Sequence, residues 1–145
     1  MILYADASLL VKLYLSERDS ADFVELLAQP MITGTALITR AEVAAALAKA
    51  ARLGALSRDD AGQSLGMFRS HWSTFVRLRF TEAIAAQADE LAWAHGLRGY
   101  DAVHLATALT WQAALNEPLT LGTYDRQLWD AGQNTGLAVW PSSRT

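Results

Sequence analysis

The chain has 145 residues, of which 52% are hydrophobic, no cysteine, and a formal net charge of −3. These values fit a single globular domain over residues 1–145, and they exclude a disulfide framework, a thiolate zinc site and a cysteine nucleophile. The negative charge argues against a protein that holds nucleic acid by bulk electrostatics, although not against an enzyme that cuts it. The apolar N-terminus has no basic start and is interrupted by Asp6 and Lys12, so we expect a cytoplasmic protein without a signal peptide or membrane span.

Short apolar runs alternate with helical patterns along the chain. In the first half, strands are predicted at 2–5 and 31–33, and helices at 8–15, 21–28, 39–53 and 57–72. The expected starts of these helices are Ser8, Ser20, Thr39 and Ser57, and the second helix is expected to stop near Pro30.

In the second half, strands are predicted at 75–80, 119–121 and 137–140, and helices at 82–95, 101–115 and 125–132. Thr81 is the expected cap of the helix that Gly96 closes. Strands that alternate with helices in this way predict an α/β domain with a mainly parallel sheet.

Acidic residues follow or begin several of these elements. Asp6 and Asp125 come directly after predicted strands, and ligands of such sheets bind beyond the carboxyl ends of the strands. Each acid alone also fits a structural role. Asp6, Asp101 and Asp125 could be turn or cap residues. Glu42 could form a capping box with Thr39.

Taken together, the acids favour a metal site. Glu42 begins an alanine-rich helix that we expect to be buried on most sides, and Asp101 begins another largely apolar helix. Carboxylates buried near one another are costly unless a cation neutralises them. Clustered oxygen donors, with no cysteine and little histidine, fit a hard ion such as Mg²⁺ or Mn²⁺.

Four segments, in order along the chain, resemble the motifs of PIN domains, particularly those of VapC-type toxins from bacterial toxin–antitoxin pairs. They are YADASLLVKLYL with Asp6, TRAEVAAALAKAARLG with Glu42, LRGYDAVHLATAL with Asp101, and LGTYDRQL with Thr123 and Asp125. The third segment is the most specific, and the four together span essentially the whole chain.

The resemblance implies a PIN-like three-layer α/β/α sandwich with about five mainly parallel strands. It also implies a Mg²⁺- or Mn²⁺-dependent ribonuclease that cleaves RNA phosphodiester bonds. We expect Asp6 and Asp101 to bind the metal directly, and Glu42 and Asp125 to complete the catalytic site through coordinated water or a second ion. A toxin of this kind would be neutralised by a small VapB-like antitoxin, and we expect a homodimer.

Other functions fit the residues less well. A phosphatase that forms an aspartyl-phosphate needs a second acid two residues after Asp6, where this chain has Ser8. A PIN fold kept as a non-catalytic scaffold for RNA or protein binding would be expected to lose one of the acids, and all four are present. A housekeeping PIN nuclease remains the alternative to a toxin.

Several further residues are candidates for supporting roles. Ser8 and Thr123 could orient water or carboxylates, or could be caps. His104 lies one turn after Asp101, and a packed, hydrogen-bonded histidine is favoured over a ligand. The candidate phosphate contacts are Lys49, Arg40, Arg98 and Arg126. Among possible base-stacking residues, we expect Trp93, Trp111 and Trp129 in the core or an interface, and Trp72 and Trp140 to be better exposed.

Overall fold

Five short apolar segments form one sheet in the computed structural model, which describes residues 1–15, 21–29 and 31–143. The strands are β1 (Ile2–Ala5), β2 (Ile32–Ala36), β3 (Val76–Leu78), β4 (Thr120–Gly122) and β5 (Ala138–Trp140). Their order is β3-β2-β1-β4-β5, and every neighbouring pair is parallel. The first strand of the chain is thus the central strand of the sheet, and the predicted α/β domain with a mainly parallel sheet is confirmed.

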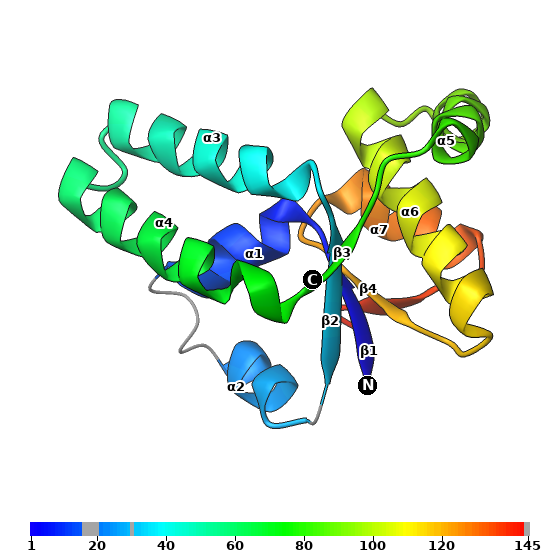
Figure 1. The fold of residues 1–145 in the computed structure, drawn as a ribbon, viewed down its shortest axis with the longest axis horizontal. Helices are drawn as coiled ribbons and strands as arrows, with labels where there is room; N and C mark the ends of the chain where they lie inside the picture. The colour runs from blue at the N-terminus through cyan, green and yellow to red at the C-terminus, as the bar shows by residue number, and fades with distance from the viewer. Residues whose placement is uncertain (16–20, 30, 144–145) are drawn as a thin grey trace.

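Helices cover both faces of the sheet (Figure 1). They are α1 (Ala7–Tyr14), α2 (Ala21–Leu27), α3 (Thr39–Arg52), α4 (Arg58–His71), the 3₁₀ helix η2 (Trp72–Thr74), α5 (Glu82–His95), α6 (Gly99–Leu115) and α7 (Arg126–Asn134). The first four pack into one core and α5, α6 and α7 into the other, on opposite sides of the sheet. This is the predicted three-layer α/β/α sandwich.

Successive side chains of β1 point to opposite faces of the sheet. Leu3 and Ala5 belong to the core formed with α1, α2, α3 and α4, whereas Tyr4 belongs to the core formed with α5, α6 and α7. A strand covered on both faces must be apolar throughout, which explains its unbroken apolar run. Each fully buried large apolar side chain contributes roughly 1.5–3 kcal/mol to stability. The two cores therefore hold the carboxyl end of β1 in place.

Most predicted helix boundaries are confirmed. Ser57 and Thr81 cap α4 and α5, and each side-chain oxygen accepts a hydrogen bond from the backbone N–H three residues further on. Gly96 ends α5 with φ at 64°, a left-handed conformation that glycine adopts without a Cβ clash. The expected start of α2 at Ser20 and its stop at Pro30 lie outside the described residues.

Two strand lengths differ from the prediction. β2 continues to Ala36, because its last residues pair with β3 and its polar Thr35 bonds the Ala5 carbonyl at 2.7 Å. β3 is shorter than the alternating run at 75–80, because it is an edge strand with one partner. In both strands, pairing with neighbours rather than the side-chain pattern sets the length.

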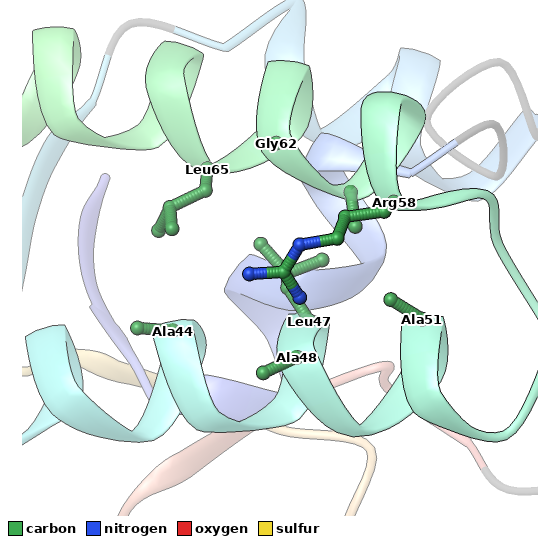
Figure 2. Close-up of a pocket in the computed structure, with 8 residues that line it drawn as sticks. Ala44, Leu47, Ala48, Ala51, Arg58, Gly62 and Leu65 are labelled. Atoms are coloured by element: carbon green, nitrogen blue, oxygen red, sulfur yellow. The ribbon is translucent and has the colours of Figure 1, made fainter.

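α3 and α4 form a hairpin that extends away from the sheet (Figure 1). Only Thr39, Val43 and Leu47 of α3 are buried, so the expectation that this helix is covered on most sides is wrong. Its alanines instead face a shallow groove beside α4, and Arg58 reaches across that groove toward α3 (Figure 2). None of the four candidate acids lines this groove.

The burial of two tryptophans differs from the prediction. Trp111 and Trp129 are buried as expected, but Trp93 is 91% exposed because α5 turns the stripe containing Ile84 and Ala88 toward the core. Trp72 is only 6% exposed, since η2 tucks its ring against phenylalanine rings of the neighbouring core. In the described part of the chain, no helix is long and apolar enough to cross a membrane.

Candidate active site

The four acids stand where strands end or helices begin. Asp6 follows β1 directly, and Asp125 follows β4 after a short turn. Glu42 lies in the first turn of α3, which comes after β2, and Asp101 lies in the first turn of α6. Because β2, β1 and β4 are neighbours in a parallel sheet, their carboxyl ends lie along the same edge.

Asp6 is the most enclosed of the four acids, with 3% of its surface exposed. Its Oδ1 accepts hydrogen bonds from the Ser8 hydroxyl at 2.7 Å and the Leu9 backbone N–H at 3.0 Å, and its Oδ2 accepts one from the Thr123 hydroxyl at 2.6 Å. The bond from Leu9 makes Asp6 the N-cap of α1. The prediction that Ser8 caps this helix is therefore wrong, because its hydroxyl is directed at Asp6.

The hydroxyls of Ser8 and Thr123 are held from both sides. Each carries one hydrogen, which it donates to Asp6. In addition, Ser8 Oγ accepts a bond from the Tyr124 N–H at 2.9 Å, and Thr123 Oγ1 accepts one from the Asp125 N–H at 3.0 Å. The two hydroxyls thus orient the Asp6 carboxylate, and the second one links it to the turn that carries Asp125.

Burial raises the pKa of the Asp6 carboxyl above its usual value. Hydrogen bonds from Thr123, Leu9 and Ser8, together with nearby His104, lower this pKa without cancelling the effect of burial. The donors around Asp6 therefore orient the carboxylate, but they offset only part of the free energy lost when its charge is buried. A positive ion placed beside it would remove that cost.

Asp101 and Asp125 are joined by one arginine. Arg98 donates from Nε to Oδ2 of Asp101 at 3.0 Å and from Nη2 to Oδ2 of Asp125 at 2.8 Å. The arginine side chain is 73% exposed, whereas those of the two aspartates are 12% and 22% exposed. The other oxygen of Asp125 accepts a bond from the Leu128 N–H at 2.9 Å, so Asp125 is also the N-cap of α7.

Asp101 does not cap its helix. It is the third residue of α6, and Arg98 precedes the helix at the cap position without a side-chain cap bond. Burial raises the pKa of the Asp101 carboxyl, and the negative charge of Asp125 raises it further, while Arg98 lowers it. The two carboxylates therefore repel each other, and the guanidinium between them offsets part of that repulsion.

The buried His104 ring bonds Glu42 and is itself bonded by the buried Tyr4 hydroxyl. The Nε2 of His104 lies 2.6 Å from Oε1 of Glu42, and its Nδ1 lies 2.7 Å from the Tyr4 hydroxyl. Burial keeps the pKa of Tyr4 well above its ordinary value, so the phenol stays protonated. Because the Glu42 carboxylate can only accept, the Nε2 of a neutral His104 ring donates to it, and Nδ1 is left to accept from the phenol. Nε2 then carries the proton that it shares with the carboxylate. His104 is a packed, hydrogen-bonded histidine, as predicted, and the residue that it holds is Glu42.

The capping box proposed for α3 is absent. The N-cap of this helix is Ile38, which makes no side-chain cap bond, and the Thr39 hydroxyl instead lies in hydrogen-bond contact with the Thr35 hydroxyl, at 2.8 Å. Glu42 is therefore not needed to start the helix, and its carboxylate turns toward His104.

The other candidate cations have different surroundings. Arg126 lines a surface hollow together with Gly96, Arg98, Asp125 and Gln127. The Arg40 guanidinium lies 5.7 Å from the centre of the Trp72 ring, and Lys49 is exposed on α3. Among these four residues, only Arg98 bonds the acids in the described part of the chain. The sequence alone did not distinguish it from the other three.

The donor set fits a hard divalent ion in its chemistry. All four acids supply oxygen, and an arginine cation already lies between two of them. Among residues 1–15, 21–29 and 31–143, however, no three or more histidine or acidic side chains are grouped as metal ligands. Arg98 bonds one oxygen each of Asp101 and Asp125, and His104 bonds one oxygen of Glu42.

The chain is similar to proteins of one known family. The family model of the PIN domain matches residues 3–132. Ribonuclease VapC45 of Mycobacterium tuberculosis (strain CDC 1551 / Oshkosh) and Ribonuclease VapC49 of Mycobacterium tuberculosis (strain ATCC 25618 / H37Rv) are each 35% identical over 147 residues, which cover 97% of this chain and 96% of the relative. A toxin–antitoxin complex from Klebsiella pneumoniae has a similar fold, with a TM-score of 0.65 and 22% identity over all of both chains.

Proposed function

This chain belongs to the PIN-domain family, and from this premise we propose that it is a divalent-metal-dependent endoribonuclease and the toxin of a toxin–antitoxin pair. One observation carries the proposal. Four acids lie at the carboxyl edge of the sheet. Thr123 links Asp6 to the backbone of Asp125, Arg98 bridges Asp101 and Asp125, and His104 bonds Glu42. Two relatives that match nearly the whole chain and are named ribonucleases support it.

We assign the residues of the site as follows. Asp6 and Asp101 bind the ion, which is Mg²⁺ or Mn²⁺, and Glu42 and Asp125 complete the site. When bound, the ion supplies positive charge that activates water and stabilises the scissile phosphate. Burial of Asp6 and the partial burial of Asp101 favour this assignment. A cation stabilises a carboxylate most where water hydrates its charge least.

The protein residues provide orientation in advance of the reaction. Three neutral donors fix the plane of the Asp6 carboxylate, so it does not have to reorganise when substrate arrives. His104, itself fixed by Tyr4, restricts Glu42 in the same way. These contacts come from both cores, so the positions of the two acids are set by the packing of the whole fold.

The partner follows from the kind of protein. A structure of similar fold is a toxin–antitoxin complex, and we propose that this chain is neutralised by a small VapB-like antitoxin. Its RNA substrate and its antitoxin would both be met in the cytoplasm, which is the location we propose.

Cleavage of RNA by the purified protein tests the enzymatic proposal. We expect cleavage with Mg²⁺ or Mn²⁺, none after chelation, and recovery when the ion is added back. The Asp6→Asn, Asp101→Asn double variant, purified in parallel, should be inactive, and its cleavage of RNA at the parent rate would reveal a contaminating nuclease or a different site. A correctly folded parent without activity under any divalent ion would instead support a binding scaffold.

Growth of a host cell tests the toxin proposal. Expression of the protein alone should arrest growth, and co-expression of a small antitoxin encoded beside it should restore growth. Robust growth of cells that contain abundant, active enzyme would indicate a housekeeping nuclease.

A further inference from the structure

The pair of contacts made by Arg98 places a positive charge where the site is most negative. Its guanidinium bonds one oxygen each of Asp101 and Asp125, at 3.0 and 2.8 Å. Asp101 and Asp125 are close enough that the charge of the latter raises the pKa of the former. The arginine thus does for these two carboxylates what a divalent ion would do.

A divalent ion and this guanidinium cannot both use the same carboxylates without repulsion. Two cations only a few ångströms apart repel strongly, most of all where burial limits screening by water. Arg98 can leave easily, because its side chain is 73% exposed and only its backbone is fixed, at the start of α6. Asp101 and Asp125 cannot follow it, because their backbones belong to α6 and to the cap of α7.

We propose that Arg98 is an internal competitor of the catalytic metal, which holds Asp101 and Asp125 together and must release them before a divalent ion binds fully. The arginine thereby sets the ion concentration at which the site becomes loaded. This inference rests on the proposed function, since it concerns the ion that the proposed nuclease uses.

Calorimetric titration of the protein with MnCl₂, without RNA, tests the competition directly. The Arg98→Gln variant removes the charge and the forked donor, and we expect it to bind Mn²⁺ roughly five- to tenfold more tightly than the parent. Arg98→Lys keeps the charge but cannot bridge two carboxylates with a planar fork, so its affinity should lie between the two.

Arg126→Gln is the matched control. Arg126 lies in the same surface hollow as Arg98 and Asp125, so this variant removes an equal charge from the same region without removing a bond to the acids. We expect its affinity for Mn²⁺ to change less than about twofold. A larger gain in Arg98→Gln than in Arg126→Gln isolates the direct contact from the general change in charge.

Thermal unfolding gives a second measurement on the same proteins. Without metal, Arg98→Gln should melt slightly below the parent, because Asp101 and Asp125 then repel without a cation between them, whereas saturating Mn²⁺ should raise its melting temperature more than the parent's. Equal or weaker binding of Mn²⁺ by Arg98→Gln, with Mn²⁺ still bound by the parent, would overturn the competition and leave the proposed function standing. Absence of Mn²⁺ binding in the folded parent and in every variant would overturn both.

Discussion

Asp6 and Asp125 occupy corresponding places in the fold, each beyond the end of a strand and at the N-cap of the helix that follows. Their surroundings differ. Neutral hydroxyl and backbone donors surround Asp6, which is almost fully buried, whereas Asp125 shares its second oxygen with the exposed, charged Arg98. One carboxylate is oriented without being neutralised, and the other is neutralised by a side chain that can move away.

This difference separates two requirements of a metal site. Neutral donors give a carboxylate a fixed direction but leave its charge in a poorly hydrated place, which favours an incoming cation. A charged partner such as Arg98 already neutralises part of the carboxylate's charge, and an incoming ion must displace that partner. In the proposed site, the Asp6 end would therefore receive an ion, and the Asp125 end would regulate how readily the site accepts one.

The largest expected effect concerns activity. Asp6→Asn and Asp101→Asn should each lower the cleavage rate at least about 100-fold, because each removes a proposed direct ligand and its negative charge. Asp125→Asn should cost only about tenfold, since its amide oxygen still caps α7 and its role is more distant. Rates are measured with one RNA at saturating Mn²⁺. Equal losses in all three variants would mean that Asp125 matters as much for cleavage as the two proposed direct ligands.

Replacement of His104 tests whether Glu42 is positioned from inside the protein. His104→Asn should lower cleavage about tenfold and reduce the free energy of unfolding by about 1–3 kcal/mol, because Tyr4 and Glu42 lose their buried partner. Urea unfolding and single-turnover cleavage measure the two effects. His95→Asn at the exposed end of α5 is the control. If His104→Asn lost stability but cleaved at the parent rate, His104 would be a core residue only.

The hydroxyl of Thr123 is the next contact to remove. Thr123→Val keeps the shape of the side chain but takes away the 2.6 Å bond to Asp6 and the acceptor for the Asp125 N–H. We expect a loss of about 1–2 kcal/mol in stability by urea unfolding, because both groups lie in a buried corner. Thr110→Val, which removes an exposed 3.2 Å bond to Gln87, should change stability by less than about 0.5 kcal/mol. Similar losses in both variants would show that the hydrogen bond from Thr123 to Asp6 contributes no more to stability than an exposed one.

The smallest expected effect is a dependence of stability on pH. Asp6 has a raised pKa in the folded protein, so the native state holds its proton to a higher pH than the unfolded chain does. The cost of its charge is absent below the unfolded pKa of about 4, grows as the pH rises, and is complete above the folded pKa. Without metal, the melting temperature of Asp6→Asn minus that of the parent should therefore increase between acidic and neutral pH. A constant difference would mean that burial does not raise the pKa of the Asp6 carboxyl.

The sequence was sufficient to predict most of the fold and the family. Apolar runs and cap residues such as Ser57 and Thr81 are local signals, and they predicted the approximate position of nearly every helix and strand. The order of the four motifs led to the PIN family, which the comparisons confirm. The positions of Asp6 and Asp125 after strands followed from the same pattern. Their roles as metal ligands remain predictions.

The contacts between these residues could not be predicted, because they depend on packing between distant segments. Arg98 could not be distinguished from Arg40 or Arg126, since nothing local says which guanidinium meets two aspartates. The chain from Tyr4 through His104 to Glu42 joins residues separated by 100 and 62 positions. The exposure of Trp93 and the burial of Trp72 likewise depend on how α5 and η2 rotate against the sheet, which an amphipathic pattern alone does not determine.

β1 precedes the other four strands of the sheet in the sequence and is the central strand of the finished sheet. Its neighbour β4 is made much later, and the bond between the Thr123 hydroxyl and Asp6 closes a loop of 117 residues. Because a ribosome makes the chain in order, an incomplete chain can carry Asp6, Glu42 and Asp101 and still lack the strand and hydroxyl that orient the first of them. The proposed nuclease therefore becomes active only after Thr123 has been synthesised and β4 has joined the sheet.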